Sequence, residues 1–421
     1  MIETISLLPG ITLRCFRDHR FKQAALSLQF VRPMDSDEAA LNALLPSVLL
    51  RGSRHHPDLR SITLRLDDLY GASVSTLVRR IGDYQTIGLY CTFLEDRFAL
   101  EGDAIFAPMV DFLSELLFDP VLEGEAFCAE FVESEKKNLI STIESERNDK
   151  RAYAAGKLLK TMCSADSFGI PRLGEPEQVA AITPAALYAH YRKILSESPV
   201  EIFYVGSADP ERVARLIQPM VSGIGGCYVN LQPQTPFRDA GGGHLREEME
   251  IAQGKLCMGF VTPITNQSPQ FAAMQVANAV FGAGMTSKLF MNIREQLSLC
   301  YAIGSGYYSS KGIVTVSAGI DSCREEEVRS QILKQLEACA RGDITAEELG
   351  AAREAMLYSL RTVHDSPGAI EGYYSTAALS GLKISPAEYM SAIEAVTAQD
   401  AADAAATVRL HSSFFLKGVN P

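Results

Sequence analysis

Two short segments of the chain, residues 26–31 and 256–261, place apolar side chains at alternate positions in the same way. In the first segment, three apolar residues alternate with polar ones (Leu26, Leu28, Phe30). This alternation is typical of a strand with one buried face. The second segment lies 230 residues later and repeats the apolar positions (Leu256, Met258, Phe260). The repeat predicts that the chain contains two copies of one folding unit.

The sequence around these two strands repeats as well. An apolar stretch with helical character ends at a glycine in each copy, at Gly52 and at Gly282. Each copy continues with a second predicted strand, long helices and a late strand (85–93 and 200–206; 312–320 and 414–419). The expected fold class is therefore α+β, with two tandem homologous domains. Each should be a mostly antiparallel sheet packed with helices.

A stretch rich in glycine and proline, residues 222–243, separates the two copies and predicts an interdomain linker. The expected domains are therefore residues 1–221 and residues 244–421. This division also suits the length, because 421 residues exceed what one hydrophobic core normally organises.

Composition narrows the functional classes. Apolar residues make up 47% and charged residues 21%, as in ordinary globular proteins, and no apolar run is long enough to span a membrane. The net charge of −12 argues against nucleic acid as a partner, because phosphate binding depends on Lys and Arg. Nine cysteines without a C-x-x-C motif, and a start unlike a signal peptide, predict reduced thiols and a cytoplasmic location.

The histidines give no metal-binding pattern. His55 and His56 are adjacent in a predicted turn before Pro57, where solvated side chains are the commoner outcome. The other five have no carboxylate or cysteine at ligand spacing (His19, His190, His244, His364, His411).

Arg294 and Tyr301 are the candidate functional residues. Arg294 lies near the end of a predicted helix, and Tyr301 opens the next strand. By spacing alone, a cation at a helix C-terminus and a half-buried aromatic explain both residues at least as well as a function does. An Arg can also bind a substrate carbonyl or carboxylate, and a Tyr hydroxyl can support developing oxyanion charge.

The stretch Lys288-Leu-Phe-Met-Asn-Ile-Arg294-Glu-Gln-Leu-Ser-Leu-Cys-Tyr301 resembles the second-domain motif of the pitrilysin, insulin-degrading-enzyme and mitochondrial-processing-peptidase family. Members of that family are zinc peptidases with an H-x-x-E-H motif. The resemblance covers nearly the whole chain and implies duplicated α+β domains. It also implies that Arg294 and Tyr301 face a zinc centre across a chamber and hold the substrate peptide.

The family's zinc ligands have no counterpart in this sequence, which contains no H-x-x-E-H. Counting back from Gly52, the positions of the motif are Ala43, Pro46 and Ser47, and the third ligand position falls on Thr142. None of these can bind zinc as the family's ligands do or abstract a proton. Pro46 is also expected to disrupt the helical turn that presents the ligands. No metal or other cofactor is expected in this chain.

The resemblance implies a non-zinc subunit of a heterodimeric zinc peptidase, with no peptidase activity alone. A homologous partner would supply H-x-x-E-H and zinc, and this chain would close the chamber and bind the substrate peptide, by adding it as a strand to a sheet edge. The subgroup it looks most like is associated with the aminopentanol modification of elongation factor P. The alternative is a catalytically inert scaffold, or a peptide-binding homodimer, of the same fold.

Overall fold

The computed structural model describes residues 2–225, 231 and 235–419. The chain divides into two compact units, and neither unit is continuous in sequence. Unit 1 consists of Met1–Glu144, Ile170–Gln232 and Val363–Leu379. Unit 2 consists of Ser145–Gly169, Pro233–Thr362 and Ser380–Pro421. Each unit therefore takes one segment from the opposite half of the chain.

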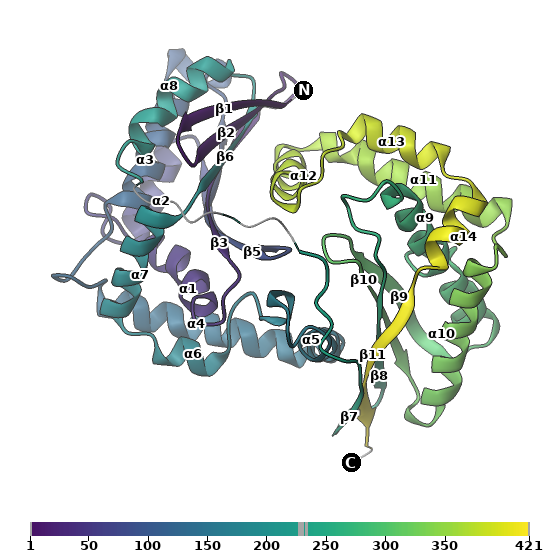
Figure 1. Ribbon diagram of the computed structural model, residues 1–421. Coiled ribbons are helices and arrows are strands. Elements are labelled where there is room, and N and C mark those ends of the chain that lie inside the picture. Colours follow the sequence, from purple (N-terminus) through teal and green to yellow (C-terminus); the bar gives the residue numbers. More distant parts are fainter. Residues whose placement is uncertain (1, 226–230, 232–234, 420–421) are drawn as a thin grey trace. The chain divides into compact units, whose positions relative to one another are not determined.

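Unit 1 is built on a six-stranded sheet with the order β1-β2-β6-β3-β5-β4 (Figure 1). Neighbouring strands are antiparallel except for β2 and β6, which are parallel. The strands are β1 (Ile2–Leu8), β2 (Ile11–Arg17), β3 (Gln23–Pro33), β4 (Ser73–Ile81), β5 (Tyr84–Leu94) and β6 (Val200–Gly206).

Helices of the first half cover one face of this sheet and form the largest hydrophobic core. The apolar side chains of β3 that point to this face pack with Leu44 of α1, Phe112 of α3 and Ile194 of α7. The helices are α1 (Ala39–Leu49), α2 (Leu59–Asp68), α3 (Phe106–Phe118), α4 (Ala129–Asn148), α6 (Pro176–Ala181), α7 (Pro184–Glu197) and α8 (Pro210–Val221), with 3-10 turns at Asp96–Phe98 and Leu100–Gly102.

The opposite face of the same sheet is covered by α12 (Pro367–Ser380), which comes from the second half of the chain. Ile370 of α12 packs with Phe16 and Val205 of the sheet. Glu371 is buried and accepts hydrogen bonds from Ser27 at 2.8 Å and from Gln29 at 2.9 Å. Strand β3 is therefore buried on both faces, and the expectation of one solvent-facing side is wrong.

Unit 2 is built on a five-stranded sheet with the order β7-β11-β8-β10-β9. Its strands are antiparallel except for the parallel pair β7 and β11. The strands are β7 (His244–Met249), β8 (Gly254–Val261), β9 (Cys300–Tyr308), β10 (Ile313–Ile320) and β11 (Arg409–Gly418).

Both faces of this second sheet are also covered. On one face, Phe260 of β8 meets Phe281 of α9 at 6.5 Å between ring centroids. On the other, Leu158 of α5 packs with Cys257 and Phe414. The helices of this unit are α5 (Lys150–Met162), α9 (Phe271–Phe281), α10 (Glu325–Ala340), α11 (Ala346–Thr362), α13 (Pro386–Ala395) and α14 (Ala398–Ala405), a π-helix at Leu289–Gln296 and 3-10 turns at Ser167–Gly169 and Ser322–Arg324; a further turn, Val363–Asp365, belongs to unit 1.

The two sheets share one plan, which confirms the predicted fold class and duplication. Without β1, the order β2-β6-β3-β5-β4 matches β7-β11-β8-β10-β9, and the parallel pair is at the same end. The two repeated segments lie in β3 and β8, at the same place in each sheet. The boundaries at 221 and 244 stay a prediction, and residues 226–230 and 232–234 of the predicted linker lie outside the described residues.

A buried ion pair in unit 2 ties the loop after α5 to the start of β10. The Lys311 ammonium lies 2.9 Å from the Asp166 carboxylate, and both side chains are at most 1% exposed. Asp166 also accepts hydrogen bonds from the backbone N–H groups of Phe168 and Arg238, at 2.9 and 3.1 Å. One carboxylate therefore fixes three separate segments of the chain.

A buried polar chain in unit 1 runs from α7 through α1 to β5. The ring Nε2 of His190 lies 2.7 Å from Asn42 Oδ1, and the Asn42 amide donates to Gln85 at 2.8 Å. Burial lowers the pKa of His190 to about 4, against the opposing effect of Glu38. His190 is therefore neutral near pH 7.

Candidate functional site

Three of the four predicted zinc positions lie on α1. Ala43 and Pro46 are buried and Ser47 is partly buried. The helix continues through Pro46 to Leu49, so the expectation that Pro46 would disrupt this turn is wrong. Pro46 has no N–H to donate to the carbonyl of Asn42, four residues earlier, and the helix nevertheless runs past it. The turn is present, but its side chains are an alanine, a proline and a serine.

The fourth position, Thr142, lies on α4 and is exposed. Its hydroxyl donates to the carbonyl of Asn138 at 2.9 Å, a bond within its own helix. Glu135, two turns earlier on the same helix face, pairs at 3.2 Å with Arg51, which follows the end of α1. This pair brings α4 to the end of α1. That the four positions are equivalent to a zinc site stays a prediction.

Arg294 lies on the π-helix Leu289–Gln296, and its side chain is 40% exposed. The guanidinium stacks over the ring of Phe290, 4.5 Å from its centroid, and lies 3.7 Å from the Glu295 carboxylate. At the N-terminal end of this helix, the buried Lys288 pairs with Glu348 at 2.8 Å and so holds the helix in place. Short π-helices are uncommon and are frequent at functional sites, because they change the direction in which side chains point.

Tyr301 lies at a β-bulge on the edge strand β9. Ile320 of β10 faces Cys300 while Gly319 faces Ala302, so Tyr301 has no opposite residue. Its side chain is 59% exposed, and its hydroxyl donates to Asp321 at 3.3 Å. Bulges of this kind redirect one side chain and are common next to active sites. Here the bulge presents an aromatic ring to solvent instead of to the core.

The segment that joins Arg294 to Tyr301 is strained. Ser298 has a φ of 51°, in the left-handed region that non-glycine residues seldom adopt. Burial raises the pKa of the Cys300 thiol to about 11, and the positive charge of Arg294 acts in the opposite direction. Together, the two side chains can donate hydrogen bonds to a carbonyl and pack an aromatic ring against a bound chain.

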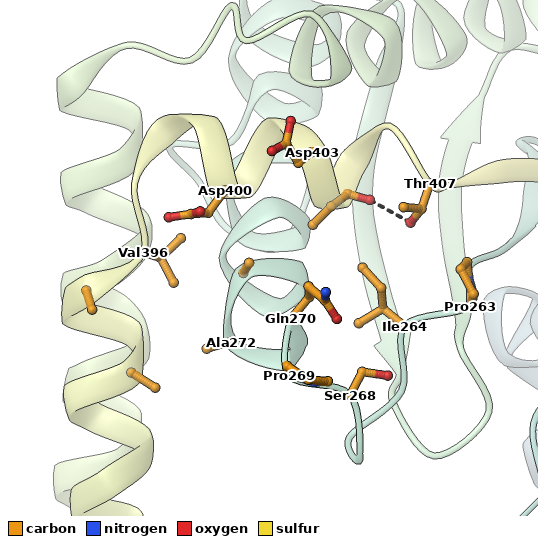
Figure 2. A pocket seen from close by; sticks show the side chains of 14 residues that line it. Pro263, Ile264, Ser268, Pro269, Gln270, Ala272, Val396, Asp400, Asp403 and Thr407 are labelled. Atoms are coloured by element: carbon orange, nitrogen blue, oxygen red, sulfur yellow. Dashed lines mark hydrogen bonds between the residues drawn. The ribbon is translucent and has the colours of Figure 1, made fainter.

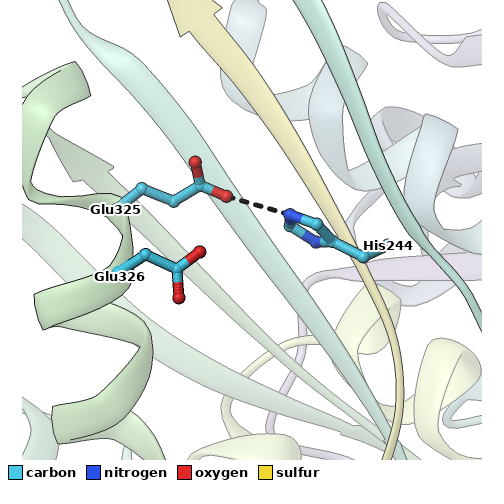
Figure 3. A group of neighbouring side chains, drawn as sticks. All are labelled: His244, Glu325 and Glu326. Carbon is cyan, nitrogen blue, oxygen red and sulfur yellow. Dashed lines mark ion pairs between the residues drawn. The ribbon is translucent and has the colours of Figure 1, made fainter.

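Sequence spacing gave no signal for a cluster formed by His244, Glu325 and Glu326, which Figure 3 shows converging from β7 and the start of α10. The three residues offer ligand atoms within 4.8 Å of one another. However, Arg246 also contacts both carboxylates, at 3.0 Å from Glu325 and 3.2 Å from Glu326. Arg246 offsets the negative charge of the two carboxylates, so a metal ion would have to displace Arg246 before it could bind the same oxygens.

The adjacent histidines contact two acidic residues, one in α3 and one directly after it. His56 Nδ1 lies 2.7 Å from Glu115, which also binds the Ser53 hydroxyl, and His55 lies 3.8 Å from Asp119. These contacts fix the loop after α1 to α3. They explain both residues structurally, without a metal.

We expect the purified chain to contain far less than one equivalent of zinc. The positions on α1 and α4 supply no imidazole or carboxylate, and zinc in proteins depends on such ligands. Elemental analysis after dialysis measures the zinc content directly. About one zinc per chain would contradict this prediction, and its survival in His244→Ala would show that the His244 cluster is not its site.

Comparisons with known proteins converge on one family. The family model described as the peptidase M16 inactive domain matches residues 181–356. A Bacillus subtilis (strain 168) relative named "Probable inactive metalloprotease YmfF" is 30% identical over 410 residues, covering 97% of this chain and 96% of the relative. A conserved protein from Enterococcus faecalis V583 has a similar structure, with a TM-score of 0.92, 28% identity and coverage of 100% and 99%. The peptidase M16 inactive domain structure from Pseudomonas fluorescens shares the fold, with a TM-score of 0.81, 16% identity and coverage of 99% and 98%.

None of the helices in the described ranges is both long enough and apolar enough to cross a membrane.

Proposed function

This chain belongs to the peptidase M16 family and is of its inactive type, and on that basis we propose that it is the non-zinc subunit of a two-chain zinc peptidase. In this proposal a homologous partner carries H-x-x-E-H and zinc and hydrolyses the peptide bond. This chain holds the substrate peptide with Arg294 and Tyr301. It has no peptidase activity without the partner.

The observation that carries the proposal is the local geometry between Arg294 and Tyr301. A π-helix, a left-handed serine and a β-bulge occur within one short stretch, and the two side chains that result are exposed. A left-handed non-glycine residue costs conformational energy, and π-helices and β-bulges are frequent at functional sites. Such a cost is understandable if the exposed pair serves to bind another molecule.

The edge strand β9 supports an extended peptide as the substrate. Within the described ranges it pairs with no strand but β10, although on its outer side the N–H of Ser305 already donates to the carbonyl of Gly282 at 2.9 Å, so a peptide would pair nearer to Tyr301. A peptide that adds to this edge would gain main-chain hydrogen bonds with little sequence preference. It would also pass Tyr301, which lies at the start of β9.

The partner and the pathway are also part of the proposal. A cytoplasmic heterodimer with an H-x-x-E-H subunit is the first choice, and the link to elongation factor P modification stays a prediction from resemblance. The alternative is an inert scaffold or a peptide-binding homodimer. A homodimer would still use the exposed pair to bind peptide, whereas a scaffold would not need it.

Truncating Arg294 to Ala is expected to reduce kcat/KM of the mixed complex by about tenfold or more. The reason is the loss of one charge-assisted contact to the substrate. Tyr301→Phe, which removes only the hydroxyl, should give a smaller loss. The measurement is hydrolysis of an extended peptide by the complex with the H-x-x-E-H partner, with melting temperature and complex formation followed in parallel.

The matched control is Arg341→Ala, which removes another exposed cation of the same unit, one paired with Glu337 at 3.1 Å. It should leave hydrolysis unchanged. Full activity of both Arg294→Ala and Tyr301→Phe complexes would refute the binding role and favour the scaffold. If activity falls only in proportion to a lowered melting temperature, Arg294 and Tyr301 contribute to stability and not to substrate binding.

A further inference from the structure

Two adjoining cavities of unit 2 form a groove that involves neither Arg294 nor Tyr301. The larger, of about 780 Å³, lies between the start of α9, the end of α13 and α14 (Figure 2). The smaller, of about 400 Å³, lies between the loop before α9 and residues 381–384. The two cavities share four lining residues and therefore adjoin (Ser268, Pro269, Ala272, Ala392).

The residues that line the groove are mostly apolar, and many have short side chains. Five alanines from three helices line it (Ala272, Ala273, Ala392, Ala395, Ala404). Pro263 and Pro269 lie in the loop opposite α14, where their rings add apolar surface without an N–H donor. A surface of this kind accepts a chain with small side chains and gives it few directed contacts. Specificity must therefore come from polar groups at its margins.

The two ends of the groove carry opposite charges. Asp400 and Asp403 lie on α14 beside the larger cavity (Figure 2), and Lys383 lies at the smaller one. Hydrogen bonds from Thr397 lower the pKa of Asp400, so this carboxylate is ionised near pH 7. Across the described ranges, no oppositely charged side chain pairs with any of the three. Thr397 donates to one oxygen of Asp400 at 2.8 and 2.6 Å and Gln399 to one oxygen of Asp403 at 2.7 Å, so the second oxygen of each carboxylate is the one that a ligand can use.

A buried acceptor in the smaller cavity lacks a donor. Asn266 is only 7% exposed, and its Nδ2 donates to the carbonyl of Ser380 at 2.9 Å. Its Oδ1 is buried and accepts no hydrogen bond from the residues that the structure describes. This oxygen is almost inaccessible from the cavity, so a donor could reach it only if the loop before α9 shifts.

We propose that this groove binds a short peptide with free termini in an extended conformation. The α-amino group lies beside Asp400 and Asp403, and the carboxylate lies beside Lys383. The alanine walls favour small side chains. The groove is then a second peptide site, separate from the Arg294 and Tyr301 region and independent of any partner's zinc.

Alanine peptides of three to six residues are suitable probes, titrated into the full chain by isothermal calorimetry. We expect saturable binding by at least one length, and about tenfold weaker binding once the same peptide is acetylated and amidated, because both charged termini are then lost. Asp403→Asn and Lys383→Met should each weaken binding severalfold. Ala392→Phe should abolish it by filling the shared wall.

Two control variants test whether the groove is the binding site. Glu354→Gln removes a charge from exposed α11 and should not change the affinity. Arg294→Ala should not change it either, which separates this proposal from the proposed function. Absence of saturable binding at every length, equal binding of capped and free peptides, or loss of binding in Arg294→Ala would each overturn the groove as the site.

Discussion

Replacing Lys311 by Met is expected to lower the free energy of unfolding by roughly 3–5 kcal/mol. The substitution keeps most of the side-chain volume but removes the cation that lies 2.9 Å from Asp166. The carboxylate then stays buried without its counter-charge, and removing one partner of such a pair is far more costly than removing both. Urea unfolding followed by circular dichroism and tyrosine fluorescence measures the change, since the chain has no tryptophan.

The double variant Lys311→Met with Asp166→Asn is the control. Phe168 and Arg238 donate to different oxygens of Asp166, so the single amide oxygen of asparagine can keep one of these two bonds, and the double variant should recover only part of the lost stability. A Lys311→Met protein within about 1 kcal/mol of the wild type would show that the pair is solvated and contributes little. Destabilisation by the double variant equal to the sum of both single variants would deny any coupling between the two charges.

Acidification from pH 6.5 to pH 4 is expected to destabilise the protein, with His190 contributing about 3 kcal/mol of the loss. Burial lowers the pKa of His190 to about 4 in the folded protein, whereas an unfolded histidine titrates near its ordinary value. Between these two pH values the unfolded chain binds a proton that the folded chain does not. Stability therefore falls as the pH falls through this window, and it is fully present above it.

The variant His190→Gln should flatten the stability profile over that window, because glutamine can donate to Asn42 without titrating. His55→Gln serves as the control, since His55 is largely exposed, and should keep the wild-type slope. Burial and Arg20 also lower the pKa of His364, which titrates in every variant. The decisive quantity is therefore the difference in pH slope between His190→Gln and the wild type. Glu38 acts at lower pH, because Arg32 and Lys193 overcome its burial and lower its pKa to about 2. An unchanged slope in His190→Gln would show that this histidine titrates normally.

The arrangement of strands in the two sheets could be predicted from the sequence because the two halves of the chain repeat one pattern. Alternating apolar residues in β3 and β8, with a glycine after the following helix, were enough to place equivalent strands. The edge strand β4 was missed, since its burial alternates weakly, whereas the strand expected to open near Tyr301 is present as β9. The one-sided burial predicted for β3 failed because its second cover, α12, is separated from it by more than 300 residues.

The site was predictable only in part, for a related reason. The motif singled out Arg294 and Tyr301, but their exposure depends on a π-helix and a bulge that have no simple period. Ser27 and Gln29 read as surface residues until Glu371 of α12 satisfies them in the interior. Similarly, His244 meets Glu325 only through the parallel pairing of β7 with β11 and the position of α10. Long-range pairings of this kind leave no local pattern.

The exchange of α5 and α12 between the units affects the order in which the protein can be completed during synthesis. Unit 1 needs residues up to Leu379, so its sheet stays uncovered on one face while about 150 further residues are made. At typical synthesis rates that interval is on the order of ten seconds. During it, the apolar side chains that later meet Ile370 are open to other contacts. The nascent chain is therefore most vulnerable to aggregation, and most dependent on chaperones, after its first sheet has formed and before its last third has emerged.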